Sequence, residues 1–292
     1  MSSMKVKSLD KLITNALEIE TEAAKEAGAL GYMARALVQA TMPHSKISGS
    51  EFKRTNGLFK LTILADSEIG LPYGSLPRLL LAWISTEAVR TKNRHLVLGR
   101  TLSAFMAELD LMPTGGRWGT ITRLKDQMKR LFGASISCTY DDGNHWAIKN
   151  ISPVSTADLW WNPKQPNQAT IFESTLTLNE DFFKEITTHP IPIDIRALKA
   201  LKRSPLALDI YCWLTYRLSY LRQSTTIPWA VLQLQFGSDY ATNQQGVRNF
   251  KKAFLRELKK VNLFYQKAKL DLLEEGLNLK PGSSHVKKLI TL

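Results

Sequence analysis

Apolar residues recur along the chain with periods that predict helices joined by short strands. From Ser75 to Thr91 they recur at helical spacing, with Ser75 as the N-cap and Pro77 in the first turn. Five elements are then predicted in order: a strand at 95–98, helices at 102–109 and 117–132, and strands at 135–140 and 146–151. The last two strands flank Asp141-Asp-Gly-Asn, a strong hairpin signal. Helix, strand, helix, helix and hairpin is the element order of a winged helix.

The second half of the sequence predicts the same order again. An apolar helix over 205–221 has proline in its first turn, and a short strand is expected at Thr225-Thr-Ile. Helices at 229–236 and 243–261 follow, and then a hairpin over 263–280. Because the halves share no obvious sequence identity, the repeat is one of architecture.

These patterns predict an α+β, mainly helical chain with two tandem winged-helix domains. Residues 1–58 are expected to form an N-terminal helical segment and linker, with a helical pattern from Ser8 to Ala40 that is one helix or two. The first winged-helix domain is placed at 59–155 and the second at 156–292. A length of 292 residues is sufficient for two such cores.

The charge of the chain favours a polyanionic partner. The formal net charge is +13, and each phosphate that a protein neutralises releases counterions. Much of the excess lies in two predicted helices: 115–134 holds five basic residues against one acidic, and 242–262 holds six against one. These are the third helices of the two halves.

Both third helices are predicted to be amphipathic. In the second, Phe250, Phe254, Leu258 and Val261 form one stripe at about 100° per residue. The opposite face carries the candidate DNA-binding residues Arg248, Lys252, Arg256 and Lys259. In the first, the stripe of Ile121, Leu124, Met128 and Leu131 leaves Thr120, Arg123, Gln127 and Arg130 outward, with Lys125 and Lys129 on the flanks. Arginine, glutamine and threonine can bond base edges as well as phosphates.

Other interpretations of these segments stay open. One basic amphipathic helix is equally well a solvated surface helix, whereas two in equivalent positions favour nucleic-acid binding. Gly115, Gly116 and Gly119 suit either the approach of a phosphate to a helix N-terminus or a plain turn. In the predicted hairpin, His145 and Lys149 are weaker candidates for contacts with DNA, and Trp146 is expected in the core.

The sequence argues against several other classes of protein. The five histidines are dispersed, so no metal or other cofactor is expected. A nicking enzyme needs a tyrosine beside a His-apolar-His pair, which is missing, so no catalytic activity is expected. The longest apolar run, 79–84, is far below the roughly 20 residues that span a bilayer. Cys138 and Cys212 are expected to be buried free thiols of a cytoplasmic protein.

Several segments together resemble the plasmid-encoded RepA-type replication initiators, over roughly residues 60–290. They are Leu76-Pro-Arg-Leu-Leu-Leu-Ala-Trp-Ile-Ser-Thr-Glu-Ala-Val-Arg-Thr, Leu98-Gly-Arg-Thr-Leu-Ser-Ala-Phe-Met, Thr114-Gly-Gly-Arg-Trp-Gly, Ser204-Pro-Leu-Ala-Leu-Asp-Ile-Tyr-Cys-Trp-Leu-Thr-Tyr-Arg-Leu and Gly246-Val-Arg-Asn-Phe-Lys-Lys-Ala-Phe. Each segment alone is a weak match, and the order of the segments carries the resemblance.

The resemblance implies a protein that recognises repeated sites in the double-stranded DNA of a plasmid origin, helps to open an adjacent AT-rich segment and recruits host replication proteins. The implied host partners are the replicative helicase and the host initiator, and one domain is implied to serve also in homodimerisation and copy control. It assigns base recognition to Arg248, Asn249, Lys252 and Arg256 in one helix, and to Arg117, Thr120, Arg123 and Gln127 in the other.

Two rival functions remain at this stage. A transcriptional regulator of the same double winged-helix architecture fits the same helices, and the sequence does not separate the two. A DNA-nicking initiator is the rival of another class. It would leave a covalent 5′ adduct on origin DNA, whereas a binding initiator would protect a repeat array without strand scission.

Overall fold

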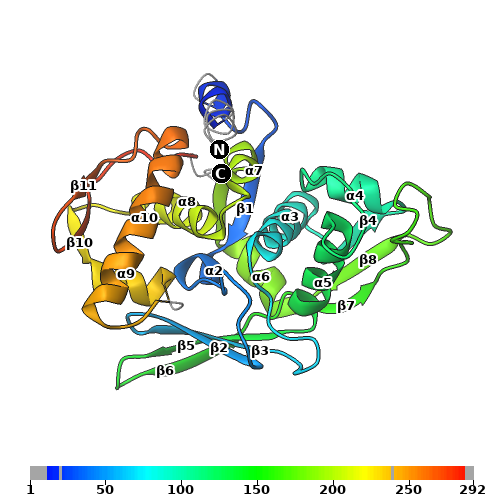
Figure 1. Ribbon diagram of the computed structural model, residues 1–292, viewed down its shortest axis with the longest axis horizontal. Helices are drawn as coiled ribbons and strands as arrows, with labels where there is room; N and C mark the ends of the chain where they lie inside the picture. Colours follow the sequence, from blue (N-terminus) through cyan, green and yellow to red (C-terminus); the bar gives the residue numbers. More distant parts are fainter. Residues whose placement is uncertain (1–11, 20–21, 238–239, 287–292) are drawn as a thin grey trace.

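The computed structural model describes residues 12–19, 22–237 and 240–286 (Figure 1). It mixes helices and strands, with more helix than strand, which confirms the predicted α+β class. Two helices, α3 (Ser75–Thr91) and α8 (Pro205–Leu218), lie at the centre, with the first half of the chain beside α3 and the second half beside α8. Among the described residues, no helix is both long enough and apolar enough to cross a bilayer.

Each central helix begins a set of elements with the same topology. After α3 come β4 (His95–Gly99), α4 (Leu102–Glu108) and α5 (Thr120–Phe132) and, beyond two strands that join another sheet, β7 (Val154–Asp158) and β8 (Ser174–Leu178). After α8 come β10 (Thr225–Pro228), α9 (Trp229–Phe236), α10 (Gln244–Phe264), β11 (Leu270–Leu272) and β12 (Gly276–Leu279). The strand orders are β4-β8-β7 and β10-β12-β11, so in both sets the first strand pairs with the last.

The hairpin predicted for the first half belongs to a different sheet. The strands β5 (Ser135–Asp141) and β6 (Trp146–Asn150) continue β2 (Glu51–Asn56) and β3 (Phe59–Leu64) in the order β2-β3-β5-β6. Their inward residues find matching apolar partners there, since Ile136 lies opposite Ile63 and Cys138 opposite Leu61.

The strand that completes the first half is instead β8. It pairs with β4, so residues 174–178, predicted to lie in the second domain, are placed with the first half. The predicted boundary between residues 155 and 156 falls inside β7, which pairs with β8. The loop from 159 to 173 therefore joins the two strands of this hairpin.

The N-terminal segment joins the two halves. Residues 12–19 are helical, but 30–34, predicted as helix, form β1 (Leu30–Ala34), which pairs antiparallel with β9 (Pro190–Asp194). Pairing across the fold thus overrides the local helical pattern. A Cβ on Gly31 would lie 2.2 Å from Ile195 Cδ1, so this close approach requires glycine. The start of the predicted helix, residues 8–11, lies outside the described residues.

Three short helices flank this strand pair. They are α2 (Arg35–Gln39), α6 (Glu180–Thr188) and α7 (Ile195–Leu201). Beyond α2, Thr41 donates a hydrogen bond to the Gln235 carbonyl and Gln235 donates one to the Gln39 carbonyl, so α9 of the second half is tied to the same segment.

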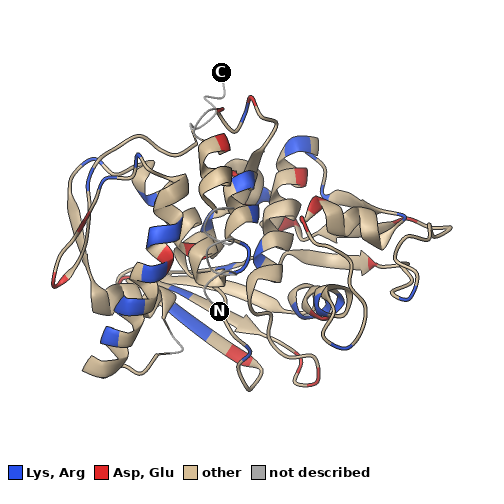
Figure 2. Ribbon diagram, turned by 45° about the horizontal axis from the view of Figure 1, so that its top comes forward, with Lys and Arg blue, Asp and Glu red and all other residues tan. Residues whose placement is uncertain are grey.

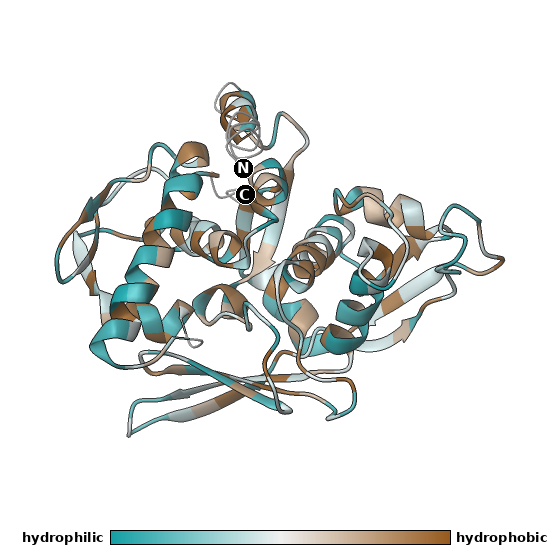
Figure 3. Ribbon diagram, viewed as in Figure 1, coloured by the Kyte–Doolittle hydropathy of each residue, from teal (hydrophilic) through white to brown (hydrophobic). Residues whose placement is uncertain are grey.

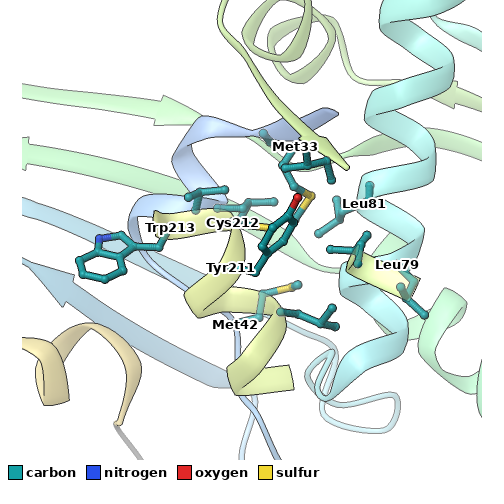
Figure 4. Close-up of a cluster of buried hydrophobic side chains, with 14 of the residues drawn as sticks. Met33, Met42, Leu79, Leu81, Tyr211, Cys212 and Trp213 are labelled. Carbon is teal, nitrogen blue, oxygen red and sulfur yellow. The ribbon is translucent and has the colours of Figure 1, made fainter. Parts of the chain in front are cut away.

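Apolar side chains fill the space between α3, α8 and β1. Figure 4 shows Met33, Leu81, Tyr211 and Cys212 packed together there. Cys138 and Cys212 are both free and buried, as predicted. Burial raises the pKa of the Cys138 thiol to about 12, so little reactive thiolate forms near neutral pH.

A buried ion pair crosses this core. Arg78 of α3 is 1% exposed, and its Nε and Nη2 atoms each lie 2.7 Å from a carboxylate oxygen of Asp209 on α8. The same guanidinium donates hydrogen bonds to the carbonyl oxygens of Met42, Pro43 and Gly74. Every charged N–H group is therefore matched by an acceptor, which a buried charge requires.

His44 completes the arrangement, with its Nε2 atom 2.7 Å from Asp209 Oδ2. Burial alone would raise the pKa of Asp209, but the Arg78 charge and the His44 hydrogen bond outweigh it and lower the pKa. Burial lowers the pKa of His44 despite the neighbouring carboxylate. His44 is therefore neutral near pH 7 and donates Nε2–H to Asp209.

We predict that Asp209→Asn lowers the free energy of unfolding by about 3–5 kcal/mol, because it leaves the buried Arg78 charge uncompensated. Urea unfolding followed by circular dichroism measures the change. The matched control is Glu180→Gln, which removes an exposed carboxylate paired with Lys184 and should leave the unfolding midpoint nearly unchanged. Equal sensitivity to both substitutions would contradict a central role for the buried pair.

We also predict that stability falls as the pH drops below about 6.5. Since the pKa of His44 in the folded chain is below its ordinary value of 6.5, the unfolded chain binds a proton there that the folded chain does not. The unfolding free energy measured between pH 7.5 and about 5 should therefore decline, and His44→Gln should make the decline shallower. An unchanged slope in the variant would assign the acid sensitivity to other groups.

Candidate nucleic-acid interface

The long helix α10 presents two different faces. It starts at Asn243, whose side chain accepts a hydrogen bond from the Gly246 amide, as an N-cap does. The predicted apolar stripe is confirmed, because Phe250, Phe254, Leu258 and Val261 are all at most 3% exposed. Phe250 and Phe254 pack against each other with tilted rings, and Tyr240 and Trp229 meet them edge to face.

The opposite face of α10 is polar and cationic. All five residues predicted as DNA-binding in this helix lie exposed on it: Arg248, Asn249, Lys252, Arg256 and Lys259. Figures 2 and 3 show lysines and arginines spaced along this helix and its alternation of hydrophilic and hydrophobic residues. Arg256 also lies 2.8 Å from the buried carboxylate of Glu257, yet its side chain stays 70% exposed.

Lys251 has a structural role at the edge of this face. Its ammonium donates a hydrogen bond to the Glu274 carbonyl and lies 4.7 Å from the centre of the Trp229 ring. Trp229 in turn donates a hydrogen bond to the Leu273 carbonyl. The turn between β11 and β12 is thereby fixed against α10. Its tip carries Glu274 and Glu275, whose charges do not suit contact with a phosphate backbone.

The shorter helix α5 has a mixed surface. Arg117, just before it, and Arg123 on it are exposed, as predicted. Thr120 is half-buried, and its hydroxyl accepts a hydrogen bond from the Thr114 amide and donates one to the Met112 carbonyl. Thr120 therefore shapes the preceding loop, and its side chain has little capacity left for a base.

Gln127 does not point outward, and this prediction needs correction. The residue is 4% exposed, and its amide oxygen accepts a hydrogen bond from the Tyr73 backbone. Arg130 is half-buried, 2.8 Å from Asp126, with its guanidinium over the Tyr73 ring. Both side chains hold α5 against the turn before α3, because the buried arc of α5 is wider than its apolar stripe.

Lys149 and Trp146 also differ from expectation. Lys149 lies on β6 in the four-stranded sheet, with its ammonium 2.6 Å from the buried carboxylate of Glu185 on α6. Glu185 also pairs with Arg35 of α2. Lys149 thus lies in an ionic junction rather than in a hairpin beside α5. Trp146, expected in the core, is 61% exposed on the same strand.

Some exposed residues of α5 were missed by sequence reasoning. Thr122 lies on the open face, and Lys125 and Lys129, placed on the flanks of the predicted outer face, are exposed as well. If Gln127 had been counted with the buried side of α5, the predicted outer face would have been centred closer to Thr122, Lys125 and Lys129. Trp118, in the loop before the helix, is 81% exposed and carried no periodic signal.

Taken together, the two helices offer cations and amides that can bond phosphates and base edges. No group of three or more His, Cys, Asp or Glu side chains in the described part of the chain could hold a metal ion.

Comparison with known proteins identifies relatives. A family model described as plasmid encoded RepA protein matches residues 71–230, and no curated protein matches. A crystal structure of the RctB domains 2-3 is similar, with TM-score 0.52 and 12% identity, over 84% of this chain and 96% of that one. Selenomethionine derivatives of domain 2 and domain 3 of RctB give TM-score 0.57 and 13% identity, over 84% and 98%.

At these identities the RctB structures support a shared fold. The family match is more informative, because it covers more than half of the residues and includes α3, α5 and α8. The chain belongs to the family of plasmid-encoded RepA proteins.

Proposed function

We propose that this chain is a plasmid replication initiator that binds the double-stranded DNA of its origin through two winged-helix domains. The observation that carries the proposal is the exposed cationic face of α10, together with the basic helix α5 at the same place in the repeated topology. Membership of the RepA family supports the plasmid context.

The winged-helix assignment rests on two features shared by both halves. In each, a short strand follows the first helix and pairs with the last strand of a hairpin. In each, the third helix follows a brief second helix and lays an apolar stripe on the core. The first domain on this assignment ends after β8, and α6, which packs against α3 and β9, connects it to the second, while residues 30–44 pack on both.

In the proposed complex, α10 and α5 enter successive major grooves of one duplex. Arg248, Asn249, Lys252 and Arg256 reach base edges or phosphates from α10, and Lys259 meets the backbone farther along. From α5, Arg117 and Arg123 are the carried-over contacts, with the exposed lysines beside them as phosphate ligands.

The later steps are those that the family resemblance implies. Once the origin repeats are bound, an adjacent AT-rich segment opens and the host helicase and host initiator are recruited. The protein acts in these steps by binding, without catalysis of its own. Homodimerisation through one of the domains, with a role in copy control, belongs to the same proposal.

We predict that Arg248→Ala and Lys252→Ala weaken binding to DNA that flanks the gene. A phosphate contact should reduce the slope of log affinity against log salt by about one, and a base contact should cost about 1–3 kcal/mol at one position. Fluorescence anisotropy at several salt concentrations measures both effects. Lys184→Ala, which removes an exposed lysine of α6, is the matched control. Unchanged affinity in the double variant would remove α10 from the interface.

A footprint on supercoiled plasmid with Mg²⁺ separates the rival functions. An initiator should protect an array of repeats and leave both strands intact. A covalent 5′ adduct would show a nicking enzyme, and protection confined to one promoter site would show a regulator.

A further inference from the structure

The loop before α5 exposes two large apolar side chains that have no role inside the protein. Met112 is 80% exposed and Trp118 is 81% exposed. A tryptophan contributes a large apolar area when it is buried, and leaving it in water forgoes that stabilisation. Such a side chain beside a basic helix suggests an external partner.

The same loop is held in one conformation. The Thr114 amide donates to the Thr120 hydroxyl and the Thr120 amide donates to the Thr114 hydroxyl, both at 2.9 Å. A Cβ on Gly119 would lie 2.2 Å from the Thr114 carbonyl oxygen, so glycine is required there. The loop therefore presents the indole without the cost of ordering a flexible segment.

Charge around the indole indicates the kind of partner. The guanidinium of Arg117 lies 5.2 Å from the centre of the Trp118 ring, a cation–π contact. No acidic residue occurs between Asp110 and Asp126, whereas Arg117, Arg123 and Lys125 all do. An exposed indole in a segment whose only charges are positive is suited to bind a polyanion that carries an apolar group on its surface.

Duplex DNA has one such group on the edges of its bases in the major groove, the 5-methyl of thymine. Guanine offers the O6 and N7 acceptors that an arginine bonds with both of its N–H groups. The residues at the N-terminal end of a recognition helix are those that reach base edges. Arg117 and Trp118 lie in the loop that leads directly into that end of α5.

We propose that Trp118 contacts the 5-methyl group of a thymine in each bound repeat, and that Arg117, stacked on the indole, bonds the guanine of a neighbouring base pair. This inference rests on the proposed function and adds a specificity-determining residue to it. It adds an apolar contact to the base recognition already proposed for Arg117 and Arg123 of the first domain.

The test replaces thymidine by deoxyuridine, one position at a time, in a footprinted repeat. This exchange removes the methyl group alone. Wild-type protein should bind one substituted duplex roughly fourfold more weakly, the effect of one buried methyl-sized group. Trp118→Ala should bind the unsubstituted duplex more weakly and lose this discrimination. Trp160→Ala, which removes another half-exposed tryptophan from the 159–173 loop, should keep it.

Three results would overturn the inference. The first is that no single deoxyuridine substitution weakens binding by the wild type. The second is that Trp118→Ala discriminates between the substituted and unsubstituted duplexes as well as the wild type does. The third is that Trp118→Ala loses binding to the isolated single strands but binds the duplex as the wild type does. Because the Trp118 side chain is exposed, Trp118→Ala should unfold at the same temperature as the wild type. An unchanged unfolding temperature would show that weaker binding by the variant does not come from misfolding. If the wild type binds no duplex from the flanking DNA, the proposed function itself has failed, whatever the result for Trp118.

Discussion

The ion pair between Arg78 and Asp209 is the interaction on which the arrangement of the two halves depends. It joins the first helix of one repeated set to the first helix of the other, and the remaining donors of Arg78 bind the carbonyl groups of Met42, Pro43 and Gly74. Attraction between buried charges offsets their desolvation only when the geometry is good and other donors are satisfied. Both conditions are met here, so the pair specifies how α3 and α8 meet.

Around that pair, the chain crosses between the halves more than once. The strand β1 pairs with β9, and α9 of the second half packs against β2 of the four-stranded sheet. On the other side, Lys149 of that sheet is held by Glu185 of α6. The sheet therefore lies beneath both halves, as Figure 1 shows, and the two basic helices project from one continuous body.

Much of the local structure followed from the spacing of apolar residues. The helices α3 and α8 were predicted because apolar residues fill most of their length, and α10 with its cationic face was predicted because its apolar stripe is long and regular. The partner of each strand could not be predicted in this way. Periodicity shows that 135–151 is a hairpin, but not that its inward residues match β3 rather than β4.

The candidate site was harder to predict where polar residues are buried. Gln127 looked like part of the outer face because it is polar, yet the Tyr73 amide binds it from within. Arg78 and Asp209 fall on apolar helices, and a charge in such a position is a signal for a buried pair. The sequence holds that signal in two segments of the family resemblance, although nothing local indicates that they meet.

The pairing of β1 with β9 has a consequence for the DNA that such a protein could accept. Because the β1–β9 pairing and the buried ion pair both tie the two halves together, the fold sets the separation between α5 and α10. On the proposed function, the protein requires a fixed spacing between the two major-groove sites that α5 and α10 contact. A base change in an origin repeat would then cost the contact at that position alone, whereas an inserted or deleted base pair would displace one helix from its groove.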